Sequence, residues 1–295
     1  MSSLKEVRNR ITSIDSTRKI TSAMKMVSAS KLRRAQSLIV QLRPYARKLN
    51  ELISNLSGSL NKDENPLFKQ HEEINKVLLI VVSSNRGLCG GFNSNILKYT
   101  TKLIETTYKE QNAAGNLKFI TIGRKATEFV LKKHGNLIES YDHLTEKTNF
   151  EECVGIANML MEKYSNGEFE KIEIIYHQFV NAGYQEVVQE VFLPIQPPKV
   201  DENSLKFETD YIYQPDKESI TEDIVPKILR LQFYKAIVDS VASEHGARMT
   251  AMHKATDNAT DILKDLKLVY NKARQAAITN EILEIVSGAE ALENA

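Results

Sequence analysis

The residues with the clearest potential for chemistry lie in a glycine-rich segment, Ser83-Ser-Asn-Arg-Gly-Leu-Cys-Gly-Gly91, which we call the glycine loop. Glycines between a strand and a helix can let a phosphate approach the backbone amides, so this segment raises a nucleotide-binding hypothesis. The match is poor, because the segment lacks the Lys-Ser/Thr ending of a P-loop and the three-glycine spacing of a dinucleotide site. We therefore favour a tight, sterically demanding turn over phosphate binding.

The other reactive residue types form no pattern that predicts catalysis. Cys89 lies in the glycine loop with no histidine near it in sequence, so a packing role fits it better than a nucleophilic one. Cys89 and Cys153 are the only two cysteines, too few for a disulfide framework and without metal-site spacing, which fits a reducing compartment. The six histidines are scattered. We expect no catalytic residue, no metal and no cofactor.

The glycine loop belongs to a predicted small, Rossmann-like α/β domain over residues 75–215. An apolar run before the loop is typical of a fully buried parallel strand. After it, predicted strands and helices alternate along the chain, and a turn at Asn181-Ala-Gly183 predicts a strand pair. The expected strands span 76–82, 117–122, 172–180 and 184–193, and the expected helices span 94–108, 124–134 and 151–164.

Both ends of the chain predict long helices. The first begins at a capping box, Ser3-Leu-Lys-Glu6. Apolar residues then recur in one heptad phase, the repeat of a coiled-coil seam, by which we mean the positions that face the partner helix. In the N-terminal helix these are Leu4, Val7, Ile11 and Ile14, then polar Arg18, Thr21, Lys25 and Ser28, then Leu32, Ala35, Ile39, Leu42, Ala46, Leu49, Ile53 and Leu56. Pro44 should bend this helix without ending it.

The C-terminal quarter predicts a second helix, over about residues 224–286, with the same repeat. Its seam is expected at Leu231, Tyr234, Val238, Val241, Met252, Ala255, Ala259, Ile262, Leu266, Val269, Ala273 and Ala276, with a polar interruption at His245 and Arg248. Aligning the two polar interruptions in an antiparallel coiled coil puts Leu4 opposite a position near Leu266. The two helices are expected to form a rod, as an N-terminal coiled-coil helix over 1–60 and a C-terminal one over 220–290.

Charge is distributed unevenly although the chain is nearly neutral. The 39 basic and 38 acidic residues give a net charge of +1, so the molecule as a whole has no strong attraction to nucleic acid or anionic membrane. Residues 1–56 carry twelve Lys or Arg and three Asp or Glu, a net of +9, which leaves −8 for the remainder. The sequence contains no run of the ~20 apolar residues that span a bilayer and no signal-peptide core, so we expect a soluble chain.

Four stretches resemble the gamma subunits of ATP synthases, and the resemblance extends along nearly the whole chain. They are residues 18–32, 84–93, 247–258 and 270–288. The resemblance implies a central rotor shaft of bacterial type, in which a bent antiparallel coiled coil turns inside a ring of alternating alpha and beta subunits. Such a subunit is not itself catalytic, and it couples proton flow through the c-subunit ring to ATP synthesis or hydrolysis.

The resemblance also implies roles for single residues and partners. Residues at the beta-subunit coupling surface are Met24, Lys25, Arg248, Arg274, Gln275, Thr279 and Glu281, and those at the base on the c ring are Tyr211, Tyr213, Gln214 and Asp216. Gln214 stands where the family often has Glu, which puts a charged contact there in doubt. The implied partners are the alpha, beta and epsilon subunits and the c ring, at the cytoplasmic face of the bacterial inner membrane, with no nucleic acid.

Two other classes of protein remain as alternatives. A nucleotide-binding α/β enzyme with a coiled-coil oligomerisation arm would bind ATP saturably. A basic coiled-coil adaptor for nucleic acid would bind random DNA in a salt-sensitive manner, although its basic residues lack interleaved aromatics.

Overall fold

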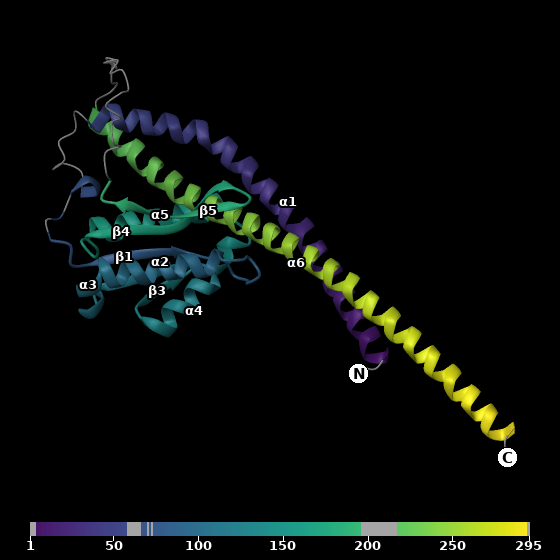
Figure 1. The fold of residues 1–295 in the computed structure, drawn as a ribbon. Helices are drawn as coiled ribbons and strands as arrows, with labels where there is room; N and C mark the ends of the chain where they lie inside the picture. Colours follow the sequence, from purple (N-terminus) through teal and green to yellow (C-terminus); the bar gives the residue numbers. More distant parts are fainter. Residues whose placement is uncertain (1–3, 58–65, 70, 72, 196–216, 294–295) are drawn as a thin grey trace. The chain divides into compact units, whose positions relative to one another are not determined.

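The computed structural model describes residues 4–57, 66–69, 71, 73–195 and 217–293 (Figure 1). Two long helices, α1 (Leu4–Ser57, 54 residues) and α6 (Lys217–Glu293, 77 residues), flank a domain with a five-stranded sheet in the sequence. The prediction of long terminal helices around a small α/β domain is confirmed. Helix α1 continues through Pro44, as predicted, because a proline removes a single helical hydrogen bond.

The chain divides into two compact units, and each long helix contributes to both. Unit 1 comprises residues 1–28 and 249–295, and unit 2 comprises residues 29–248. Unit 2 therefore holds the whole sheet together with the later part of α1 and the first part of α6. Unit 1 holds the two remaining helical segments.

The sheet of unit 2 has the strand order β3-β2-β1-β4-β5. Its first four strands run parallel, and β5 is antiparallel to β4. The strands are β1 (Val77–Val82), β2 (Leu117–Ile122), β3 (Leu137–Ser140), β4 (Lys171–Asn181) and β5 (Tyr184–Leu193). The shorter helices are α2 (Phe92–Thr106), α3 (Lys109–Ala113), α4 (Arg124–Lys133) and α5 (Phe150–Ser165), and two 3-10 turns span Pro66–Phe68 and Asp142–Thr145.

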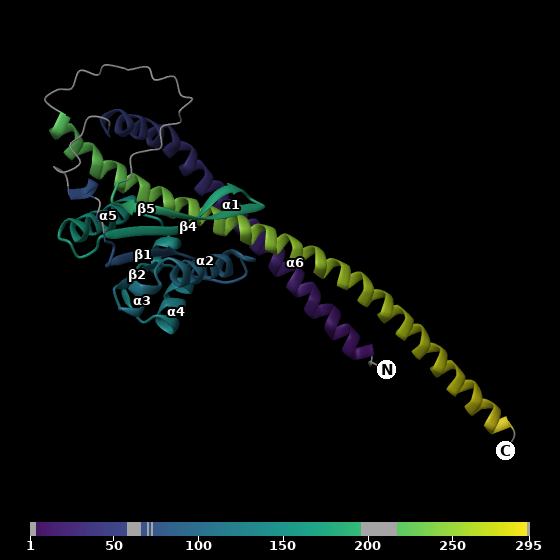
Figure 2. The same ribbon diagram turned by 60° about the vertical axis from the view of Figure 1, so that its left-hand side comes forward.

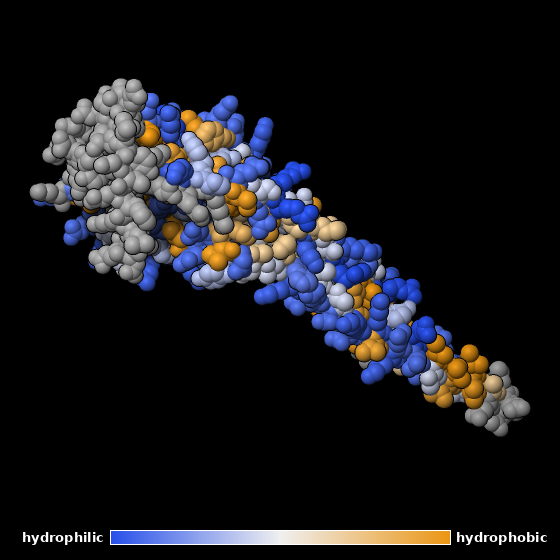
Figure 3. All heavy atoms as spheres, turned by 90° about the horizontal axis from the view of Figure 1, so that it is seen from above, coloured by the Kyte–Doolittle hydropathy of each residue, from blue (hydrophilic) through white to orange (hydrophobic). Residues whose placement is uncertain are grey.

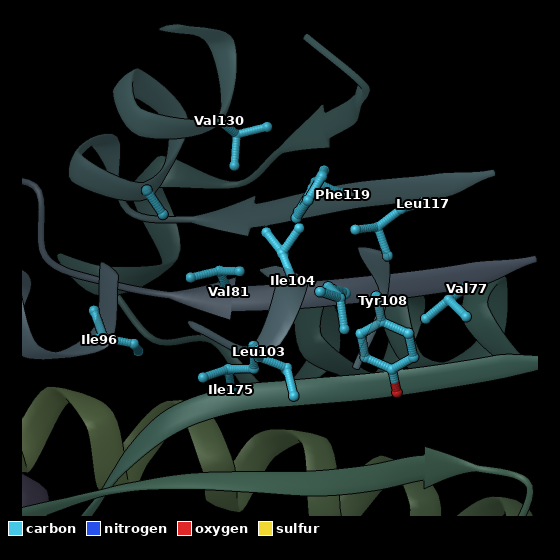
Figure 4. Packing of buried hydrophobic residues seen from close by; sticks show 12 residues of the cluster. Val77, Val81, Ile96, Leu103, Ile104, Tyr108, Leu117, Phe119, Val130 and Ile175 are labelled. Carbon is cyan, nitrogen blue, oxygen red and sulfur yellow. The ribbon is translucent and has the colours of Figure 1, made fainter. Parts of the chain in front are cut away.

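Helices cover both faces of this sheet. Helices α2, α3 and α4 lie on one side, and α5 with the unit 2 part of α6 lies on the other, as Figures 1 and 2 both show. Every residue of β1 is buried, because this central strand is covered on both faces. Figure 4 shows one side of the core, where apolar side chains of the sheet, including Val81, Phe119 and Ile175, face Ile96 and Leu103 of α2.

Four short elements were not predicted: β3, α3 and the 3-10 turns at Pro66–Phe68 and Asp142–Thr145. Strand β3 has four residues, three of them exposed, at the edge of the sheet. Helix α3 has five residues, none of them buried. Neither segment carries a periodic apolar pattern. Strand β3 lies at the edge of the sheet, where backbone pairing to β2 suffices, and α3 buries no residue.

The burial expected for the α1 seam is observed as far as its side chains are described, to Leu49. Each seam position is buried or half-buried, including the polar ones. Thr21 and Ser28 are buried in the polar stretch, while Ile20 and Val27, its most apolar residues, are exposed. A constant heptad phase, and not local hydrophobicity, therefore decides which face of α1 is covered.

The seam predicted for the unit 1 part of α6 is wrong at three of its eight positions, Ile262, Val269 and Ala276, which are exposed. Ile262 and Val269 are 43% and 51% exposed, whereas Leu263 is 7% exposed. From Met252 onward, the buried or half-buried positions are Met252, Ala255, Thr256, Ala259, Thr260, Leu263, Leu266, Tyr270, Ala273 and Ala277. Five predicted positions are therefore covered, and each of the three exposed residues comes one position before a covered one, at Leu263, Tyr270 and Ala277. Apolar residues occupy both sets, so hydrophobicity could not distinguish a step of three from a step of four.

Three side-chain contacts fix how α1 and α6 pair within unit 1. Arg8 donates to the Tyr270 hydroxyl at 2.9 Å, the Thr21 and Thr256 hydroxyls lie 2.8 Å apart, and Lys25 Nζ lies 3.4 Å from Nδ1 of His253. The two segments therefore run antiparallel, and the paired residue numbers add to 277 or 278. Leu4 faces a position near Arg274, not Leu266 as predicted. The prediction was wrong by about two helical turns because the polar interruptions of the two helices are not aligned.

Candidate functional site

The glycine loop connects β1 to α2 through a tight turn. Leu88 and Gly90 both have left-handed backbone conformations, with φ of 62° and 59°. The side chain of Asn93, in the first turn of α2, holds the loop from inside: its carbonyl oxygen accepts from the Ser84 backbone N–H at 3.1 Å, and its amide donates to the Ser84 hydroxyl at 2.7 Å. The loop is thus ordered by its own polar side chains.

The polarity of the loop disfavours an anion. The backbone carbonyls of Arg86 and Gly87 accept hydrogen bonds from Nη2 of Arg248, at 3.2 and 3.4 Å. A phosphate site presents backbone N–H groups, whereas this loop presents carbonyl oxygens to a cation. The geometry therefore supports the interpretation of the loop as a tight turn.

Cys89 has the properties of a packing residue. Its side chain is 1% exposed, and burial raises the pKa of the thiol. A thiol with a raised pKa stays protonated at neutral pH and is a poor nucleophile. Burial likewise raises the pKa of Cys153 to about 12. Among the described residues, no group of three or more His, Cys, Asp or Glu side chains could hold a metal ion.

Met24 and Lys25 are half-buried in the polar stretch of α1. The Lys25 ammonium lies 3.4 Å from His253, which itself lies 3.5 Å from the Asp257 carboxylate. The exposed Met26 and Val27 adjoin them on the outer face of the helix. This part of unit 1 therefore presents apolar and basic groups side by side.

Arg248 is buried, unlike the other residues predicted for the coupling surface. Its Nη1 lies 2.6 Å from Oε1 of Glu244, one turn earlier on α6. Burial raises the pKa of the Glu244 carboxyl, and Arg248 opposes that rise. Burial, with Arg248 and Lys31 nearby, lowers the pKa of His245 to about 4, so this imidazole is neutral. Glu244 was not singled out from the sequence, although a Glu four residues before an Arg is a visible helical pairing signal.

Arg274, Gln275, Thr279 and Glu281 are exposed on the last part of α6. The Thr279 hydroxyl donates to the Gln275 backbone carbonyl at 2.9 Å, so it is occupied within its own helix. Exposed apolar side chains surround these polar ones, and Figure 3 shows them gathered near the end of α6. They are Ile278, Ile282, Leu283, Ile285 and Val286.

The structure does not bring all the predicted residues together. The helix pairing places residue 25 opposite residue 253, so Met24 and Lys25 lie some twenty residues along the pair from Arg274. Arg248 belongs to unit 2 and the others to unit 1. The residues predicted for the base, Tyr211, Tyr213, Gln214 and Asp216, lie outside the described residues. None of the described helices is both long and apolar enough to cross a membrane.

Comparison with known proteins gives one consistent result. A family model described as ATP synthase matches residues 3–292. The chain is 53% identical to the ATP synthase gamma chain of Flavobacterium johnsoniae, covering 99% of both chains. It is 47% identical to the ATP synthase gamma chain of Cytophaga hutchinsonii, covering 100% of both.

Solved structures share the fold at low sequence identity. A chain of the Euglena gracilis mitochondrial ATP synthase rotor aligns with a TM-score of 0.64 and 19% identity, over 93% of this chain and 98% of that one. A second structure of that synthase aligns with a TM-score of 0.67 over 98% of this chain and 94% of that one. With the family model and the full-length relatives, these findings establish that the chain belongs to the ATP synthase gamma-chain family.

Proposed function

We propose that this chain is the central-stalk subunit of a proton-translocating ATP synthase, which turns inside a ring of alpha and beta subunits. Its rotation couples proton flow through the c ring to ATP synthesis or hydrolysis. The observation that carries the proposal is the 53% identity to a gamma chain across 99% of both chains. Rotation of an asymmetric shaft can change nucleotide affinity at distant sites, because each catalytic subunit meets a different face of the shaft in turn.

In this proposal α1 and α6 form an antiparallel coiled coil, and the domain between them is Rossmann-like. The coiled coil is supported by the heptad burial of α1 and by the cross-helix contacts such as Thr21 with Thr256. The Rossmann-like assignment is supported by the parallel strand order β3-β2-β1-β4. The corresponding regions are residues 1–60, 75–215 and 220–290.

The surfaces of unit 1 support contacts with alpha and beta subunits. Residues 1–28, the part of α1 in unit 1, carry six Lys or Arg and two Asp or Glu, a net charge of +4 that suits an acidic partner surface, and exposed ion pairs can be broken and remade at little cost as the shaft turns. Met24, Lys25, Arg274, Gln275, Thr279 and Glu281 are the residues we assign to beta-subunit contacts. The exposed apolar residues near the end of α6, among them Ile282 and Ile285, suit an apolar sleeve formed by the ring.

We assign the base to the epsilon subunit and the c ring, with residues 211–216 on the c ring, at the cytoplasmic face of a bacterial inner membrane. The subunit itself is non-catalytic in this proposal. The protonated, buried thiol of Cys89 and the carbonyl-lined glycine loop support that assignment, because neither offers a nucleophile or an anion site.

The decisive experiment is Met24→Lys in the assembled complex. A second ammonium beside Lys25 should strengthen attraction to an acidic partner loop and so hinder its release, which impairs ATP-driven proton pumping more than ATP hydrolysis. Leu131→Lys, on the exposed face of α4 and away from the assigned surface, is the matched control and should leave pumping unchanged. Pumping unaffected by Met24→Lys, in a complex that assembles normally, would reject the assigned coupling surface.

A further inference from the structure

The side chain of Arg248 binds both a residue of its own helix and the glycine loop. One terminal nitrogen, Nη1, binds the Glu244 carboxylate at 2.6 Å, and the two side chains are 10% and 9% exposed. The other, Nη2, donates to the backbone carbonyls of Arg86 and Gly87. A planar guanidinium can bind both sides at once, because its donors point in fixed, divergent directions.

The glycine loop depends on such a donor at this point. The Arg86 carbonyl also accepts from the Ser84 hydroxyl at 2.7 Å, so it is the acceptor on which the turn closes. The left-handed Leu88 costs about 1–2 kcal/mol of backbone energy, and other contacts must offset it. Without the guanidinium, the loop would lose the two hydrogen bonds that attach it to α6.

Burial makes the Glu244 carboxylate part of the same arrangement. An unpaired guanidinium would be costly at 10% exposure, and Glu244 supplies the compensating charge. Lys31 of α1 and Glu146 also act on Glu244 electrostatically, with opposite signs. Glu244 therefore fixes the direction in which Arg248 points its remaining donors.

We propose that Arg248 is a latch that holds the glycine loop against α6, and that Glu244 is the residue that positions the latch. The functional consequence rests on the proposed function: Arg248 affects coupling through the loop and not through a direct contact with a beta subunit. A change in the conformation of α6 would then alter the position of the loop, because the loop carbonyls are bound to a side chain of that helix.

Cys89 gives a direct readout of the latch in the isolated full chain. It is buried inside the glycine loop, while Cys153, equally buried in α5, is an internal reference. Arg248→Lys keeps the charge but cannot span Glu244 and both carbonyls. We expect the rate of Cys89 modification by a maleimide to rise about tenfold or more, because this factor corresponds to the loss of one charge-assisted hydrogen bond. The rate of Cys153 modification should be unchanged. Glu244→Gln should give a smaller rise at Cys89 alone.

Arg230→Lys is the matched control, since Arg230 lies on the same helix and donates to Asn158 of α5. It should leave the Cys89 rate at the parent value. Arg248→Met, which removes the charge as well, should raise the Cys89 rate further. An unchanged Cys89 rate in Arg248→Lys would overturn the latch. Parallel rises at Cys89 and Cys153 would also overturn it, because Arg248 would then support the whole domain.

The consequence for coupling is tested separately in the assembled complex. Arg248→Lys and Glu244→Gln should lower ATP-driven proton pumping in the same order in which they raise the Cys89 rate. If these variants raise the Cys89 modification rate but pump protons normally, the contact between Arg248 and the glycine loop is supported and its role in coupling is rejected. Normal pumping in Met24→Lys as well would instead reject the proposed coupling surface, whatever the outcome at Cys89.

Discussion

The hydroxyl of Thr21 in α1 lies 2.8 Å from the hydroxyl of Thr256 in α6, in the half-buried seam between the two helices. Each hydroxyl is also within hydrogen-bonding distance of a carbonyl of its own helix, at Arg18 and Met252. A hydroxyl has one hydrogen, so one threonine donates across the seam while the other donates to its own backbone. The pair thus specifies which residues face each other more than it contributes net stability.

The double variant Thr21→Val/Thr256→Val should be at least as stable as the parent. It removes both polar partners and puts two apolar side chains of similar shape in a covered position. Each single variant should lose about 1 kcal/mol, because it leaves one hydroxyl without its partner. Urea unfolding followed by helical circular dichroism gives the three values and, from the cycle, the coupling energy. A double variant less stable than either single variant would contradict this account of the pair.

Gly123→Ala should prevent stable folding of the sheet domain. A Cβ on Gly123 would lie 2.3 Å from the Ser83 carbonyl oxygen, and Gly123 has a φ of +100°, so both space and backbone conformation exclude a side chain. Gly135→Ala is the control, because Gly135 also has a positive φ but nothing lies within 4 Å of its Cβ position. We expect Gly135→Ala to cost about 1–2 kcal/mol and the Gly123 variant to be recovered as aggregate. Equal stability of the two variants in thermal unfolding would show that the Ser83 contact is unimportant.

Four of the five strands could be predicted because their local patterns agree with the tertiary structure. The apolar run before the glycine loop has no exposed residue in β1, and the turn at Asn181 is closed by that side chain, which accepts from the Gly183 and Tyr184 amides. Both signals are complete within a few residues of sequence. Such segments need no knowledge of their partners to be recognised.

The contacts of Arg248 and the phase of the α6 seam could not be predicted for the opposite reason. The carbonyls that bind Arg248 belong to a loop about 160 residues away, and backbone acceptors have no sequence signature. The α6 seam is ambiguous because apolar residues occupy both adjacent phases, at Ile262 and Leu263. Only the partner helix decides between them, through contacts such as Thr21 with Thr256.

Acidification should destabilise unit 2 through His177. This side chain is buried and stacks on Phe92 with ring centroids 4.1 Å apart, and neither ring nitrogen has a hydrogen-bond partner among the described residues. Burial lowers its pKa to about 4. The neutral form is favoured in the folded state, so its contribution is complete above the unfolded pKa of about 6.5 and is lost as the pH falls from 6.5 toward 4. The loss at pH 4 should be about 3 kcal/mol.

His177→Phe isolates this contribution, because the ring can keep its stack on Phe92 and cannot take up a proton. Urea unfolding at pH 7 and pH 4.5 should show a smaller loss of stability for the variant than for the parent. The remaining loss should include His245, whose pKa is also lowered to about 4. Identical pH dependence of parent and variant would mean that His177 does not titrate on unfolding.

The phase of the α6 seam can be tested with two adjacent residues. Leu263→Ala should cost about 2–5 kcal/mol, because it leaves a cavity at a covered position between α1 and α6. Ile262→Ala should cost less than about 1 kcal/mol, because Ile262 is already 43% exposed and alanine favours the helix. Thermal unfolding of the full chain followed by circular dichroism compares the two directly. A larger loss at Ile262 than at Leu263 would restore the predicted phase. It would also contradict the pairing fixed by Thr21 and Thr256, since one phase cannot cover both sets of residues.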